Sequence, residues 1–198
     1  MSKIYGLTGG IGMGKSTAAR LLAQEGLSVV DSDDLARDAV RPGQRALEEI
    51  RTAFGGRFIQ TDGRLDRAEM ATHVFADPEA RERLEAIIHP CVREAWRTAI
   101  GEWREAGQSG VVVIPLLFEV GAEEHFDTIL CVACTAPTQR DRLRRRGWTH
   151  EQIDQRLAAQ MPIAEKMQSA HCILWNEGTT EVLRAQLLRA GCLKEKPA

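Results

Sequence analysis

The stretch of sequence that decides the fold is Gly9-Gly10-Ile11-Gly12-Met13-Gly14-Lys15-Ser16. It matches the phosphate-binding pattern G-x-x-x-x-G-K-[ST] at every fixed position. Residues 3–7 before it are typical of a short buried strand, and residues 17–23 after it of a helix. Glycines let successive backbone N–H groups curl inward around a phosphate, and the following helix adds the positive end of its dipole. We therefore expect a nucleoside triphosphate to bind here rather than a chance glycine-rich turn.

Two side chains of this phosphate loop (residues 9–16) have expected roles in phosphate transfer. Lys15 is expected to neutralise charge on the β and γ phosphates, and the Ser16 hydroxyl to bind Mg²⁺. The motif indicates the phosphate donor but not the acceptor. The predicted nucleotide-binding residues of the loop are Gly10, Ile11, Gly12, Met13, Gly14, Lys15, Ser16 and Thr17.

The composition fits one α/β domain with a small insertion. The chain has 198 residues, of which 43% are hydrophobic, and a formal net charge of −2. This charge predicts no general attraction to nucleic acid or acidic membranes, and no apolar run reaches the length of a membrane span, so we expect a cytoplasmic protein. Cys131 and Cys134 form a C-x-x-C pair. Buried reduced thiols explain this pair better than a zinc or redox site, because no second pair has ligand spacing.

Four further apolar runs predict strands, at residues 27–30, 111–114, 128–133 and 172–175. Strands that alternate with helices indicate a five-stranded, doubly wound parallel sheet. Asp31 and Asp33 follow the first of these runs, at the sheet edge where ligands bind in such folds. Either aspartate could instead be only the N-cap of the helix predicted over 34–40.

The chain between the second and third strands has a helical pattern. We interpret residues 33–107 as a helical insertion, in which His89-Pro90 ends one helix and starts the next. A second feature is a basic segment after the fourth strand, with Arg140, Arg142, Arg144, Arg145 and Arg146. It is either a solvated helix face or a lid that closes arginines over the phosphates.

Taken together, these motifs resemble the dephospho-CoA kinase family from Ile4 to about Leu187. The resemblance is specific because several short segments occur in the family's order and spacing, whereas the phosphate loop alone is shared by many kinases. These segments are Asp31-Ser32-Asp33 with Arg37, Leu65-Asp66-Arg67, His89-Pro90 with Arg93, Pro115-Leu116-Leu117-Phe118-Glu119, Gln160-Met161-Pro162 with Lys166, and Asn176 with Gly178.

The resemblance implies a P-loop kinase fold and transfer of phosphate from ATP, with Mg²⁺, to the ribose 3′-hydroxyl of dephospho-CoA. It implies a nucleotide-binding core (1–32, 108–138 and 160–198), a helical acceptor-binding insertion (33–107) and a lid (139–159). Asp33 is similar to the family's catalytic base, with Lys15 as the other catalytic residue. Arg142, Arg146 and Asn176 are implied to bind ATP. The implied substrate-binding residues are Thr8, Asp33, Arg37, His89, Arg93 and Leu116.

Val113 departs from the family pattern, since many members carry an aspartate there. Two other functions fit the phosphate loop. A nucleoside monophosphate kinase would have the same fold but a different acceptor. A nucleotide-dependent switch would have no acceptor, and the N-K-x-D segment that would indicate guanine binding is absent from the sequence.

Overall fold

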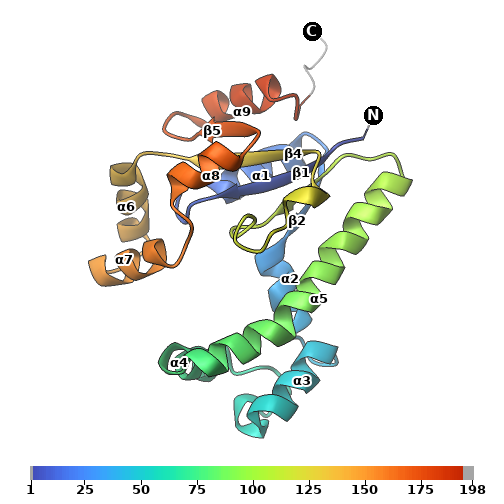
Figure 1. Cartoon of the computed structure of the whole chain (residues 1–198), viewed down its shortest axis with the longest axis vertical. Coiled ribbons are helices and arrows are strands. Elements are labelled where there is room, and N and C mark those ends of the chain that lie inside the picture. The colour runs from blue at the N-terminus through green and yellow to red at the C-terminus, as the bar shows by residue number, and fades with distance from the viewer. Residues whose placement is uncertain (1, 194–198) are drawn as a thin grey trace. The chain divides into compact units, whose positions relative to one another are not determined.

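A five-stranded parallel sheet is the framework of the larger of the two units into which the chain divides (Figure 1). The structure is a computed structural model that describes residues 2–193. The strand order is β2-β3-β1-β4-β5, so β1 is central and pairs with both β3 and β4. The prediction of a doubly wound parallel sheet is confirmed. The strands are β1 (Ile4–Gly9), β2 (Ser28–Asp31), β3 (Gly110–Val113), β4 (Thr128–Ala133) and β5 (Cys172–Trp175).

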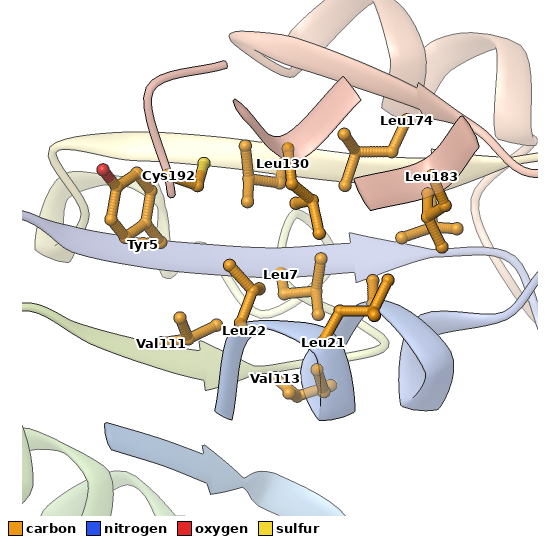
Figure 2. Packing of buried hydrophobic residues seen from close by; sticks show 14 of the residues in the cluster. Tyr5, Leu7, Leu21, Leu22, Val111, Val113, Leu130, Leu174, Leu183 and Cys192 are labelled. Carbon is orange, nitrogen blue, oxygen red and sulfur yellow. The ribbon is translucent and has the colours of Figure 1, made fainter. Parts of the chain in front are cut away.

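One face of the sheet is covered by α1 (Lys15–Gln24) and α9 (Thr180–Arg189). Figure 2 shows Leu7 and Leu130, from neighbouring strands, among the buried side chains Leu21 and Leu22 of α1 and Leu183 of α9. Burying one such leucine stabilises the fold by about 1.5–3 kcal/mol. This packing fixes α1, and with it the phosphate loop, against the end of β1.

The other face has different cover. A Cβ added to Gly6 would lie 2.8 Å from side-chain atoms of both Leu117 and Phe126, so this point of β1 accepts only a glycine. Helix α8 (Ile163–Ser169) also packs on this part of the sheet through contacts with β1 and β4. Cover on both faces explains why β3 and β4 consist of almost continuous apolar residues.

Most of the remaining helices begin at a side-chain cap. The side chains of Asp31, Asp66, Thr135 and Thr149 each accept a hydrogen bond from a backbone N–H in the first turn. Asp31 and Asp66 are thus each the N-cap of the helix that follows. The elements outside the sheet and its cover are α2 (Ser32–Ala39), α3 (Arg45–Phe54), α4 (Arg67–Ala76), α5 (Pro78–Glu105), α6 (Ala136–Arg145), α7 (His150–Ala158) and the 3₁₀ turns Gly56–Phe58 and Glu123–His125.

The chain divides into two compact units. One contains the sheet and consists of the chain up to Val30 and from Glu102 onward; the other is Asp31–Gly101. The second unit is helical and has its own core around Ile50, Phe58 and Met70. Its limits differ at both ends from the insertion predicted over 33–107. The unit begins two residues earlier, at Asp31, and it ends at Gly101, because residues 102–107 belong with the sheet. A role of this unit in holding an acceptor stays a prediction.

The predicted helix break at His89-Pro90 is wrong. Helix α5 runs without interruption from Pro78 to Glu105 and contains Pro90. A proline inside a helix costs about 3 kcal/mol, because it removes one hydrogen bond and its ring crowds the preceding turn. Trp96 and Ile100 follow the proline in the helix, and both are buried. The burial of these side chains along one face of the continuous helix offsets the cost of the proline. Despite its 28 residues α5 is rich in charged side chains, and no helix within residues 2–193 is both long and apolar enough to span a membrane.

Two glycine-to-alanine substitutions should change stability in opposite directions. A Cβ at Gly110 would lie 1.9 Å from the buried Trp103 ring, whereas a Cβ at Gly101, inside α5, would meet nothing within 4 Å. Gly110→Ala should lower the free energy of unfolding by about 1–3 kcal/mol through overpacking. Gly101→Ala should raise it by about 0.5–1 kcal/mol through helix propensity. Urea denaturation followed by circular dichroism measures both, and the same sign for the two variants would contradict this account of the packing.

Candidate active site

The phosphate loop joins β1 to α1, and two of its glycines have no substitute. Gly9 has φ +142, and a Cβ there would lie 2.2 Å from the Val132 carbonyl oxygen of β4. Gly14, the N-cap of α1, has φ +104, and a Cβ there would lie 2.0 Å from the Asn176 amide nitrogen. Left-handed backbone and close neighbours together require glycine at both positions. The loop is thus fitted to the sheet and to the segment after β5.

Several side chains donate to the carbonyl groups of the loop. Lys15 Nζ donates to the Gly9 and Gly10 carbonyls at 2.9 and 3.1 Å. Asn176 Nδ2 donates to the Met13 carbonyl at 2.8 Å, and Arg142 Nη1 donates to the same oxygen at 3.4 Å. Arg142 Nη2 also donates to the Asn176 carbonyl at 2.8 Å. Asn176 and Arg142, both predicted to bind ATP, therefore also support the loop backbone.

Ser16 is the loop side chain best suited to a metal ion. It lies in the first turn of α1 and is exposed, so its hydroxyl is accessible. Mg²⁺ commonly keeps several waters and substrate phosphate oxygens as ligands and needs few from the protein. Within residues 2–193 no group of three His, Cys, Asp or Glu side chains is arranged as a metal site. A single exposed hydroxyl fits an ion that arrives with the nucleotide.

A fully buried lysine supports the start of the loop. Lys166 of α8 is 0% exposed, and its Nζ lies 2.8 Å from both the Pro115 carbonyl oxygen and Glu119 Oε1. Thr8, also fully buried, donates its hydroxyl hydrogen to the same Pro115 carbonyl at 3.2 Å. Glu119 Oε1 accepts a further bond from the Met161 N–H at 2.9 Å. This network ties together β1, the segment after β3 and α8.

Four residues contact the loop or its support although no role is predicted for them from the sequence: Glu119, Gln139, Gln160 and Lys166. Two of them leave a signal in the helical periodicity. Gln139 is one turn before the buried Leu143, and Lys166 lies between Ile163 and Met167 on the apolar side of α8. A polar side chain on an apolar stripe indicates a buried partner. Glu119 and Gln160 lie outside the helices and leave no such signal.

Four of the predicted substrate-binding residues lie in the second unit: Asp33, Arg37, His89 and Arg93. Asp31 Oδ1 accepts the Asp33 N–H at 2.9 Å as the cap of α2, and burial raises the pKa of Asp31 despite that bond. Asp33 itself is exposed in the first turn of α2. Arg37, one turn further on, pairs with Asp34, and its carbonyl accepts a bond from Arg67 Nη2 at 3.0 Å.

His89 and Arg93 are exposed and lie four residues apart on α5. Since α5 is continuous, their side chains share one face of the helix. The structure thus brings these two residues together on one continuous helix, whereas the sequence predicted a break between two helices at His89-Pro90. Of the other predicted substrate-binding residues, Thr8 is buried in the network described above and Leu116 is 37% exposed.

The arginines of the predicted lid have several different partners. Arg140 pairs with Asp154 of α7 at 2.6 Å, and Arg144 and Arg145 pair with Asp141. Arg142 bonds to the loop, and Arg146 is exposed at the end of α6. Segment 139–159 consists mainly of α6 and α7. Its closure over a nucleotide stays a prediction.

The C-x-x-C pair is structural. Cys131 and Cys134 are both buried free thiols, and burial raises the pKa of Cys131 to about 11. Such a thiol is protonated at neutral pH and is a poor nucleophile. The predicted burial of both cysteines is confirmed.

Comparisons with known proteins agree on one family. The family model described as dephospho-CoA kinase matches residues 3–181. A dephospho-CoA kinase of Anaeromyxobacter dehalogenans is 46% identical over 91% of this chain and 87% of the relative. One from Bdellovibrio bacteriovorus is 42% identical over 88% of this chain and 87% of the relative. A crystal structure of a Thermus thermophilus protein superposes with a TM-score of 0.82 at 38% identity, over 96% of each chain.

Breaking the ion pair of the buried Lys166 should destabilise the protein strongly. Glu119→Gln leaves the fully buried Lys166 ammonium without its carboxylate, and such a loss costs about 3–5 kcal/mol. Adding Lys166→Met should recover part of this cost, because the orphaned buried charge is then removed as well. Urea denaturation of the two single variants and the double variant measures the coupling. The exposed pair Arg140–Asp154 is the control and should show much weaker coupling; equal coupling in the two pairs would contradict the assignment.

Proposed function

Because the chain belongs to the dephospho-CoA kinase family, we propose that it transfers the γ-phosphate of ATP to the ribose 3′-hydroxyl of dephospho-CoA. The products are coenzyme A and ADP. The observation that carries the proposal is a complete phosphate loop within a chain that matches the family over residues 3–181. A nucleoside monophosphate acceptor is not favoured, because the family match extends over the helical insertion as well as the loop. We further propose a cytoplasmic enzyme whose partners are small molecules and not nucleic acid.

The loop residues would hold the triphosphate. Backbone N–H groups of residues 10–17, apart from those of Ile11, Met13 and Thr17, which bond within the protein, would surround the β and γ phosphates. Lys15 would balance the charge on the migrating group. Mg²⁺ bound to ATP and to Ser16 would neutralise further phosphate charge. Arg142 and Arg146 would add to this if the lid closes, and Asn176 would lie near the adenine. The support for Arg142 and Asn176 is their contact with the loop carbonyl of Met13.

Asp33 is proposed as the catalytic base. Its exposed carboxylate in the first turn of α2 could accept a hydrogen bond from the acceptor hydroxyl and aim its oxygen at the γ-phosphate. A carboxylate is a weak base, so positioning would precede a late transfer of the proton. Arg37, His89 and Arg93, with Thr8 and Leu116, would hold the acceptor.

Substitution of the two aspartates near the end of β2 tests this mechanism. Asp33→Asn keeps the shape but removes the charge and basicity, so kcat should fall by about a hundredfold or more. ATP binding, followed with a fluorescent nucleotide, should be retained. Asp31→Asn is the matched control and should cost much less, because an asparagine can still cap α2. An inactive Asp31→Asn beside a nearly normal Asp33→Asn would overturn the choice of base.

A second test separates the two substrates. Arg93→Ala should raise the KM for dephospho-CoA about tenfold or more, since a hydrogen bond to a charged group contributes about 1.5–3 kcal/mol. The KM for ATP should change little. Arg81→Ala, an exposed arginine near the start of α5, serves as the control. An effect confined to ATP would place Arg93 with the wrong substrate.

A further inference from the structure

Two glutamines hold both peptide groups of one residue in the phosphate loop. Gln139 Nε2 donates to the Ile11 carbonyl at 2.7 Å, and the Ile11 N–H donates to Gln160 Oε1 at 3.2 Å. Gln139 lies in the first turn of α6 and Gln160 follows α7. The arginine-rich segment, residues 140–159, is the chain between them. Both of its ends are therefore attached to the same loop residue.

The direction of each hydrogen bond is set by the backbone. A peptide N–H can only donate and a peptide carbonyl can only accept, so the Gln139 amide must present its nitrogen and the Gln160 amide its oxygen. Gln139 is only 5% exposed, and burial of an amide is tolerated only when its polar atoms are paired. Gln139 is therefore held in place at a position where an apolar residue would otherwise pack.

The loop backbone on either side of Ile11 lies directly against α6. A Cβ on Gly10 would lie 3.1 Å from Gln139 Nε2, and a Cβ on Gly12 would lie 2.9 Å from Leu143. Rotation of the Ile11 peptide would turn the neighbouring N–H groups, which belong to the predicted phosphate cradle. Fixing this peptide thus fixes the direction of the donors around it.

We propose that Gln139 and Gln160 are positioning residues that hold the Ile11 peptide, so that the phosphate loop is shaped for ATP before the nucleotide arrives. This rests on the proposed function only in taking ATP as the ligand of the loop. Without the two bonds, the loop must be ordered at the expense of ATP binding energy. The loss falls on ATP and leaves the affinity for dephospho-CoA unchanged.

The same substitution at the two positions gives opposite results. Gln160→Glu keeps an oxygen that accepts the Ile11 N–H, so kcat/KM for ATP should stay within about threefold of the wild type. Gln139→Glu replaces the donor with a carboxylate facing a carbonyl, and kcat/KM for ATP should fall about tenfold or more at pH 8. Gln160→Leu removes the acceptor and should also lose activity. Gln168→Glu, on the exposed side of α8, controls for the added negative charge.

The pH profile adds a readout that a general loss of stability would not give. A carboxyl group held against a carbonyl has a raised pKa, and its protonated form can donate a hydrogen bond. The activity of Gln139→Glu relative to the wild type should therefore rise as the pH falls from 8 to 6. Melting curves confirm that each variant is folded at the assay temperature.

Two results would overturn the proposal: equal losses in Gln139→Glu and Gln160→Glu, or a KM for dephospho-CoA that rises as much as that for ATP. Equilibrium binding of a fluorescent ATP analogue is measured in parallel. If the wild-type enzyme binds this analogue but transfers no phosphate to dephospho-CoA, the proposed acceptor fails, while nucleotide affinity in the four variants still tests the role of the glutamines.

Discussion

A loop that points its N–H groups inward at a phosphate must turn carbonyl groups outward, and those carbonyls need donors. Backbone polar groups left unpaired are costly, so this requirement shapes everything around the loop. Lys15 donates to the Gly9 and Gly10 carbonyls, Gln139 to that of Ile11, and Asn176 and Arg142 to that of Met13. These donors come from α1, α6 and the segment after β5. Segments far apart in the sequence thus donate hydrogen bonds to the carbonyls of one short loop.

The end of β1 is held in an analogous way by a second set of contacts. The Pro115 carbonyl accepts from both Thr8 and the buried Lys166, and the Lys166 charge is balanced by Glu119. Buried ion pairs add little net stability, but they fix geometry when every partner is satisfied. No buried side-chain N or O atom among the described residues lacks a partner. The two sets of contacts leave the loop little freedom before ligand binds.

The sheet and the phosphate loop could be predicted because their signals are local. Apolar β-branched runs indicate buried strands, and the loop needs glycine and lysine at fixed spacing. The supporting residues could not be predicted in this way, because their hydrogen-bond partners are far away along the chain. Gln139 bonds to the Ile11 carbonyl, 128 residues away, and Lys166 bonds to the Pro115 carbonyl, 51 residues away. The prediction at Pro90 failed for the opposite reason. Proline locally favours a helix break, but the tertiary packing of α5 outweighs this preference. Asp66 followed its local rule and caps α4.

The charge of the arginine segment is partly balanced within the segment itself. Of the five arginines in residues 140–146, Arg140 pairs with Asp154, and Arg144 and Arg145 share Asp141. Arg142 differs, because it donates hydrogen bonds to the carbonyl oxygens of Met13 and Asn176, which carry no net charge. A carboxylate beside an arginine reduces the attraction of that arginine for other anions. An arginine bonded to neutral carbonyl oxygens keeps its full charge and still attracts a nearby anion. For the phosphate binding proposed here, the position of Arg142 beside the Met13 carbonyl therefore matters more than the number of arginines around it.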